Sequence, residues 1–142
     1  MEFKLFLEDT EKRPIVSFDF DGVLHTDVHP GTIHPINYFA SDLTPDEEMH
    51  DQLRKEAKDN DIIVVSARHA YGDMYDAMEE FIRNYKLPVK KIYATSGMPK
   101  RDLLEGLGVI RHYDDKDMTA ELAGTDIEFV LVGEGGKYEN IQ

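Results

Sequence analysis

Two aspartates, Asp19 and Asp21, directly follow a short apolar run in the segment IVSFDFDGVLH. Side chains two positions apart on an extended strand point to the same face, so the two carboxylates would lie close together. Carboxylates at that distance repel each other unless a cation or a shared proton stabilises them. The pair therefore predicts a divalent metal site, and a carboxylate beside such a metal can also attack phosphorus as a nucleophile.

Further polar residues follow the later apolar runs, namely Ser66, Arg68, Lys100, Asp114 and Asp115. Ligands of an open α/β sheet bind beyond the carboxyl ends of its strands, so we expect these residues to gather at one edge. Mg²⁺ prefers carboxylate and water oxygens, which Asp19 together with Asp114 or Asp115 would supply. The sequence leaves open which of these two neighbours is the metal ligand.

A phosphoryl group attacked by Asp19 needs fixed donors, because its oxygens carry negative charge in the transition state. The Ser66 hydroxyl, the Lys100 ammonium and backbone N–H groups near Gly22 are the candidates. Asp21 would donate a proton to the leaving oxygen and take one from the hydrolytic water. These roles predict hydrolysis of a phosphomonoester through an aspartyl-phosphate.

The elements that position these residues follow from the apolar pattern. Short β-branched runs over residues 15–18, 62–65, 91–94, 109–113 and 127–132 predict strands, several of them buried on both faces. Helical spacing predicts helices over 45–59 and 73–86, with shorter ones from near 100 and over 118–122, and Thr44 is the expected first N-cap. This alternation predicts an α/β fold: a three-layer, Rossmann-like parallel sheet with helices on both faces. We also expect an edge strand over 2–7 and a small flap over 22–35.

Four motifs, in their order along the chain, resemble those of the haloacid dehalogenase-like phosphohydrolase superfamily. They are the Asp-x-Asp-Gly of IVSFDFDGVLH, the Ser of IIVVSAR, the Lys of TSGMPKRDLL and the acidic HYDDKD, and they cover about residues 14–132. The resemblance implies that Asp19 is the nucleophile and Asp21 the general acid/base, which also offers its backbone carbonyl to Mg²⁺. It further implies that Asp115 or Asp114 completes the metal site.

The intervals between these motifs are largely filled by one helix and one strand each, so the chain resembles superfamily members without a cap domain. Capless members tend to act on macromolecular ends or phosphoproteins, or to borrow a neighbouring subunit as a lid, so an oligomer is compatible with the resemblance. The SAR segment and the paired aspartates are similar to those of polynucleotide 3′-phosphatases and deoxynucleotidases. A nucleotide or nucleic-acid end is the expected substrate; the alternatives are a phosphorylated small metabolite such as a sugar phosphate, or a non-catalytic acidic interaction module.

Two candidate substrate contacts have plain alternatives. His25 is expected in the flap beside the phosphate, but it could be an ordinary loop histidine, and its spacing to His29 and His34 fits no strong zinc pattern. Arg68 could bind substrate or pair with an acid. Neither choice can be made from the sequence.

Length and composition limit the number of domains, the partners and the cellular location that we expect. The 142 residues predict one domain over 1–142, with a flexible glycine-rich tail at about 133–142. The net charge of −13 disfavours binding along an extended nucleic acid. No apolar run approaches the roughly 20 residues of a membrane span, and the first residues lack the apolar core of a secretory signal. With no cysteine in the chain, we expect a cytoplasmic protein.

Overall fold

A computed structural model describes residues 12–26, 40, 43–133 and 138–141. The helices and strands in these ranges are β1 (Ile15–Phe18), α2 (Glu47–Glu56), β2 (Asp61–Ser66), α3 (Asp73–Asn84), β3 (Lys91–Ala94), α4 (Arg101–Leu107), β4 (Val109–Asp114), β5 (Glu128–Val132) and β6 (Tyr138–Ile141). They form one sheet in the order β3-β2-β1-β4-β5-β6, in which the first five strands are parallel and β6 is antiparallel to β5. The predicted α/β fold is confirmed.

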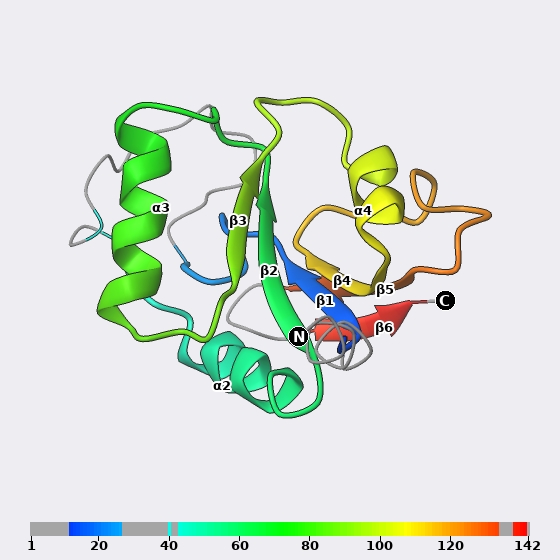
Figure 1. The fold of residues 1–142 in the computed structure, drawn as a ribbon, viewed down its shortest axis with the longest axis horizontal. Coiled ribbons are helices and arrows are strands. Elements are labelled where there is room, and N and C mark those ends of the chain that lie inside the picture. The colour runs from blue at the N-terminus through cyan, green and yellow to red at the C-terminus, as the bar shows by residue number, and fades with distance from the viewer. Residues whose placement is uncertain (1–11, 27–39, 41–42, 134–137, 142) are drawn as a thin grey trace, which may run out of the picture.

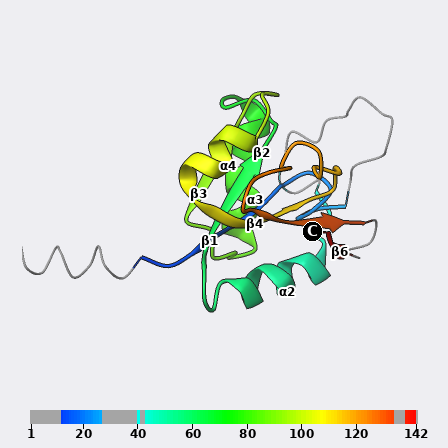
Figure 2. The same cartoon turned by 90° about the vertical axis from the view of Figure 1, so that its right-hand side faces the viewer.

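The direction in which the chain crosses the sheet decides which face each helix covers. From β1 the chain moves outward through α2 to β2 and through α3 to β3, and then returns through α4 to β4 on the other side of β1. Because crossovers between parallel strands are right-handed, the reversal places α4 on the opposite face from α2 and α3. Figures 1 and 2 show the resulting three layers.

Each face of the sheet has its own apolar core. The larger core packs α2 and α3 against one face through residues such as Met49, Leu53, Met78, Phe81 and the inward strand positions Val16, Phe18, Ile62 and Val64. The alternate strand positions, Ile63, Val65, Val109 and Phe129, pack with Leu104 of α4 on the other face. This alternation explains why the central strands consist of continuous apolar runs.

Strand register brings the ends of β1 and β4 together. Ser17 pairs with His112 and Phe18 with Tyr113, after a shift in register between Ile15 and Val16. The Asp19 N–H continues the ladder by donating to the Tyr113 carbonyl at 2.8 Å. Since the order of strands reverses between β1 and β4, this is the switch point of the sheet, where α/β folds bind ligands.

Two helix predictions differ from the structure. The first helix begins at Glu47 and is capped by Asp46, whose Oδ1 accepts from the Met49 N–H at 3.1 Å, and not by Thr44. Asp46 is held in place because its own N–H donates to the Leu24 carbonyl. The predicted helix over 118–122 is a set of turns, of which one carries the i to i+4 bond from the Leu122 N–H to the Met118 carbonyl. That segment is too short to propagate a helix.

The chain end also differs from the prediction. Residues 138–141 lie in the expected flexible tail but form β6, because the outer edge of β5 offers unpaired backbone groups to an antiparallel strand. The expected edge strand over 2–7 and most of the flap over 22–35 lie outside the described residues. Within the described part of the chain, α2 and α3 are the single helices between β1 and β2 and between β2 and β3, as expected without a cap domain. No helix described there is long and apolar enough to cross a bilayer.

Candidate active site at the carboxyl edge of the sheet

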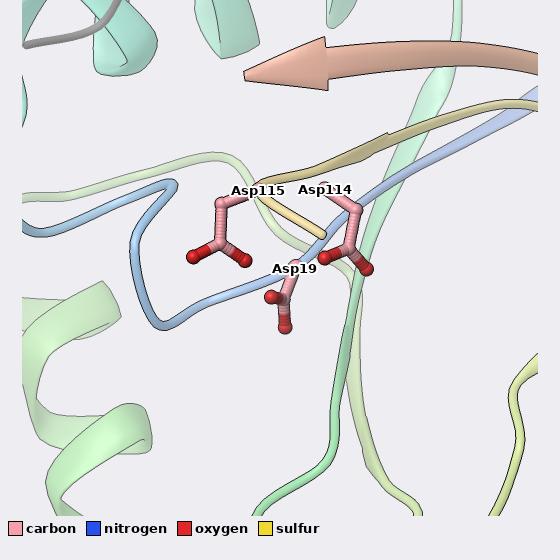
Figure 3. A group of neighbouring side chains, drawn as sticks. All are labelled: Asp19, Asp114 and Asp115. Atoms are coloured by element: carbon pink, nitrogen blue, oxygen red, sulfur yellow. The ribbon is translucent and has the colours of Figure 1, made fainter. Parts of the chain in front are cut away.

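Three carboxyl groups meet beyond the ends of β1 and β4. Asp19 follows β1, Asp114 ends β4 and Asp115 comes next, and one oxygen of each lies within 4.8 Å of the others. Figure 3 shows the three groups turned toward a common space. Burial is the main reason why the pKa of Asp19 lies well above its usual range, and the charge of Asp114 raises it further. The sheet thus gathers like charges that repel one another.

Lys100, the residue before α4, places its ammonium among these carboxylates. Its Nζ donates to Asp114 Oδ2 at 2.8 Å and lies 3.1 Å from Asp19 Oδ1. Burial would lower the pKa of Lys100, but the two carboxylates raise it to about 12, so the group is charged at neutral pH. Lys100 is the one lysine or arginine described in contact with the three carboxyl groups, which leaves an excess of negative charge.

Asp114 and Asp115 have different surroundings although they are neighbours. Asp114 is buried, and its oxygens accept from Lys100, from His112 and from the Lys116 N–H. Burial would raise its pKa, but His112 and Lys100 lower it below the usual range. Asp115 faces the cavity and is open to solvent on that side, and partial desolvation of its carboxyl group together with the charge of Asp114 raises its pKa to about 6. Asp115 is the carboxylate whose charge is less well compensated.

Gly22 allows the turn after β1 to pass close to Asp115. Its φ of +78° lies in the left-handed region, and a Cβ built there would collide with the Asp115 carboxylate. The glycine that the sequence suggested as a source of backbone donors is therefore required for the close approach of the two loops.

Asp21 is held by Arg68 and His25. Arg68 donates to both of its oxygens, from Nε at 2.9 Å and from Nη2 at 2.7 Å, and His25 Nε2 lies 2.7 Å from Oδ1. Burial would raise the pKa of Asp21, but the hydrogen bonds from Arg68 and His25 lower it below its usual range. Arg68 also donates to the Met74 carbonyl at 2.6 Å. The two side chains predicted to contact substrate, Arg68 and His25, are buried and bind Asp21.

Ser66 ends β2 and is fully buried, and its Oγ accepts from the Arg68 N–H at 3.0 Å. This contact stabilises the loop that carries Arg68. Ser66 lies behind the described lining of the site, which at this point is formed by Ala67.

A buried pair behind the carboxylates was missed from the sequence. Ser17 Oγ lies 2.6 Å from His112 Nδ1, and His112 Nε2 lies 2.9 Å from Asp114 Oδ2. Because an ionised carboxylate can only accept, Nε2 carries the proton and Nδ1 accepts from the Ser17 hydroxyl. Burial lowers the pKa of His112, which favours this neutral form. The signal was available: each residue interrupts an otherwise apolar strand face, on neighbouring strands.

The site opens into a cavity of about 340 Å³. Its lining includes Asp19, Asp21, Lys100, Asp114, Asp115, Lys116, Gly97, Met98 and Pro99. The structure therefore brings five of the predicted site residues to one cavity, and it places Ser66, Arg68 and His25 behind them.

The carboxylates fit a hard divalent cation. All three offer oxygen, the donor that Mg²⁺ prefers, and a dication would offset both the burial and the mutual repulsion that raise the pKa values of Asp19 and Asp115. Asp19 and Asp115 would hold such an ion, with Asp114 oriented behind them by Lys100 and His112.

The fold is similar to that of two solved RNA-repair structures. No protein-family model and no curated protein sequence matches the chain. A chain in the structure of the Pnkp1/Rnl/Hen1 RNA repair complex aligns over 88% of this chain with a TM-score of 0.63 and 15% identity. A chain in a second structure of the Pnkp1/Rnl/Hen1 complex aligns over 89%, with a TM-score of 0.63 and 17% identity. This chain spans 44% and 48% of the lengths of those two, and at such identity the similarity establishes a shared fold.

Proposed function

We propose that the protein is a Mg²⁺-dependent phosphomonoester hydrolase of the haloacid dehalogenase-like type, acting on a nucleotide or nucleic-acid end. The observation that carries this proposal is the meeting of Asp19, Asp114 and Asp115 with one buried lysine, Lys100, at the switch point of the sheet. Strongly shifted carboxyl pKa values in a cavity are typical of functional sites. The fold shared with chains of an RNA repair complex supports the nucleic-acid end as substrate.

Asp19 performs the first step. One of its oxygens forms a bond to phosphorus while the bond from phosphorus to the leaving oxygen breaks, which gives an aspartyl-phosphate. Lys100 lies 3.1 Å from Asp19 Oδ1 and donates to the phosphoryl oxygens as their charge develops. Asp19 and Asp115 would hold the Mg²⁺, which when bound would supply positive charge to offset the repulsion between carboxylate and phosphate.

Asp21 performs the second step as a base. Arg68 and His25 keep it ionised, the state in which it takes a proton from the attacking water while the bond between phosphorus and Asp19 breaks. The ionised Asp21 carries no proton for the first step, so a leaving group that needs one departs only when Asp21 is protonated, whereas an aryloxide leaves without a proton. Aryl phosphates are therefore the most sensitive first substrates.

The experiment measures turnover of p-nitrophenyl phosphate with Mg²⁺ by wild type, Asp19→Asn and the control Asp117→Asn. Asp117 is an exposed aspartate outside the described cavity lining, so its variant should keep wild-type activity. We expect Asp19→Asn to lose at least about 10³-fold in kcat, because the nucleophile is removed. Acid-quenched wild type, but not Asp19→Asn, should carry one added phosphoryl group by mass spectrometry.

Folded wild-type protein without turnover, or an active Asp19→Asn, would contradict the proposal. The first outcome would favour an acidic interaction module. Among active outcomes, a comparison of nucleoside monophosphates, 3′-phosphorylated oligonucleotides and sugar phosphates identifies the substrate class, and preference for sugar phosphates would overturn the nucleic-acid assignment.

A further inference from the structure

The loops that follow β2 and β3 form one continuous rim beside the cavity. The Gly97 N–H donates to the Ala67 carbonyl and the Ser96 N–H to the Arg68 carbonyl, both at 2.9 Å. Ser96 Oγ in turn accepts from the Ala70 N–H at 3.1 Å. In Figure 1 the two loops lie at the same end of the sheet, above β2 and β3. Because these hydrogen bonds join the two loops, the backbone positions on either loop are fixed relative to each other beside the cavity.

This rim carries two large hydrophobic side chains in solvent. Tyr71, on the loop after β2, is 75% exposed, and Met98, on the loop after β3, is 67% exposed. The other large hydrophobic residues described as exposed, Tyr85 and Ile110, are about half as accessible. Met98 also lines the cavity that holds Asp19. Tyr71 and Met98 therefore lie on two joined loops beside a polar site, where exposed apolar side chains are available to bind a ligand.

The rim offers flat, polarisable surface. The His69 and Tyr71 rings have centroids 5.9 Å apart and an interplanar angle of 33°, which leaves an aromatic pair at the surface. A methionine thioether packs well on aromatic rings, and tyrosine stacks on the face of any base. These side chains suit a planar aromatic group whose attached phosphate enters the cavity.

The charge distribution around the site also favours a ligand that binds through a planar aromatic group. Arg68 and Lys100 are both bound by carboxylates of the site, and the chain carries a net charge of −13. Among the residues that line the described cavity, Lys116 is the remaining cation. A site with so few available cations is poorly suited to neutralise a row of phosphates. Stacking on a base supplies affinity without that requirement.

We propose that Tyr71 and Met98 form a stacking platform for the nucleobase of the nucleotide whose phosphate is removed. This inference rests on the proposed phosphatase function and narrows its substrates to base-bearing phosphates. Tyr71 is a specificity-determining residue, and the phosphate chemistry belongs to the cavity.

The test compares kcat/KM for a 3′-phosphorylated dinucleotide with kcat/KM for glycerol phosphate, which has no base. Tyr71→Ala should lower the ratio of these two values by about 10-fold, the size of one base–aromatic stacking contact, mainly through KM. Tyr71→Phe should restore the wild-type ratio, because the ring rather than the hydroxyl carries the contact. Ile110→Ala, on β4 outside the described cavity lining, is the matched control and should leave the ratio unchanged.

The outcomes separate this inference from the proposed function. If wild type hydrolyses both substrates and Tyr71→Ala leaves the ratio unchanged, the platform is wrong and the phosphatase stands. If folded wild type hydrolyses neither compound nor p-nitrophenyl phosphate, both are wrong. A Tyr71-dependent preference for a phosphotyrosine peptide over the dinucleotide would overturn the nucleobase in favour of a protein substrate.

Discussion

Strand β4 carries a charged cluster on each face, and the two are built differently. On the α2 face, Glu56 accepts from Arg111 Nε at 2.7 Å and Nη2 at 3.0 Å and from the Tyr113 hydroxyl at 2.6 Å. Arg111 also donates to Glu128 at 2.9 Å. We call these four residues the Glu56 network. Burial would raise the pKa of Glu56, but the donors lower it.

On the opposite face and edge, Asp19, Asp114, Asp115 and Lys100 form what we call the acidic cluster. Here the pKa values of Asp19 and Asp115 are raised instead. Alternation along β4 explains how two environments lie so close, since Arg111 and Tyr113 face one way and His112 and Asp114 the other. A carboxylate saturated by donors stabilises the fold, whereas crowded carboxylates favour the binding of a cation. The comparison therefore contrasts charge that stabilises the fold with charge that would favour a bound cation.

Among variants that compare the two clusters, the largest effect should come from removing Lys100, the cation of the acidic cluster. Lys100→Met leaves the carboxylates and the phosphoryl oxygens without their ammonium donor, so kcat for p-nitrophenyl phosphate should fall about 10²- to 10³-fold. Lys58→Met, at an exposed position after α2, is the control and should keep wild-type kcat. Circular dichroism establishes that the variants are folded. A folded Lys100→Met with wild-type turnover would remove the lysine from the mechanism.

An intermediate effect should follow from opening the Glu56 network. Arg111→Met leaves Glu56 without its charged donor and should lower the free energy of unfolding by about 2 kcal/mol, measured by urea denaturation. Turnover per folded molecule should stay within about two-fold of wild type, because the network faces away from the cavity. If Arg111→Met strongly reduced turnover and left stability unchanged, the Glu56 network would not be the structural cluster that we describe.

The smallest effect concerns Asp115 and has a defined pH dependence. Its pKa of about 6 lies above the usual value of 3.8, so the folded state binds the proton more tightly than the unfolded state. Stability from this group is therefore present at low pH and is lost as the pH rises toward and through 6. At pH 7 without metal, Asp115→Asn should raise Tm by roughly 2–4 °C, and at pH 4 the difference should vanish.

The same Tm measurement with added magnesium tests whether Asp115 is a metal ligand. At ten times its dissociation constant magnesium should stabilise wild type by about 1.4 kcal/mol, or roughly 4 °C in Tm, and it should stabilise Asp115→Asn less. Asp117→Asn serves again as control. An equal magnesium shift in wild type and Asp115→Asn would show that Asp115 is not a ligand.

The strands and the acidic edge could be predicted because they depend on local pattern. Apolar runs locate the five parallel strands, and the rule for open sheets then places Asp19, Lys100 and Asp114 together. The surroundings of Asp21 could not be predicted, since Arg68 is 47 positions away and its orientation depends on how the loop after β2 folds. The sequence is compatible with either a substrate or an acidic side chain as the partner of Arg68. The folded structure shows that the partner is Asp21.

The cap of the first helix and the end of the chain show the same limit. Thr44 and Asp46 are both good caps, and the bond from the Asp46 N–H to the Leu24 carbonyl, distant in sequence, selects Asp46. The strand Tyr138–Ile141 is stabilised by β5 rather than by its own pattern. Choices that depend on distant partners are beyond local reasoning.

The antiparallel β6 also determines how the sheet meets other molecules. Among the described strands it pairs with the outer side of β5, and β3 forms the border at the other side of the sheet. That border is four residues long and begins at exposed Lys91, directly after exposed Lys90. Short borders with lysines resist the addition of a foreign strand, which protects sheet proteins against fibrous self-association.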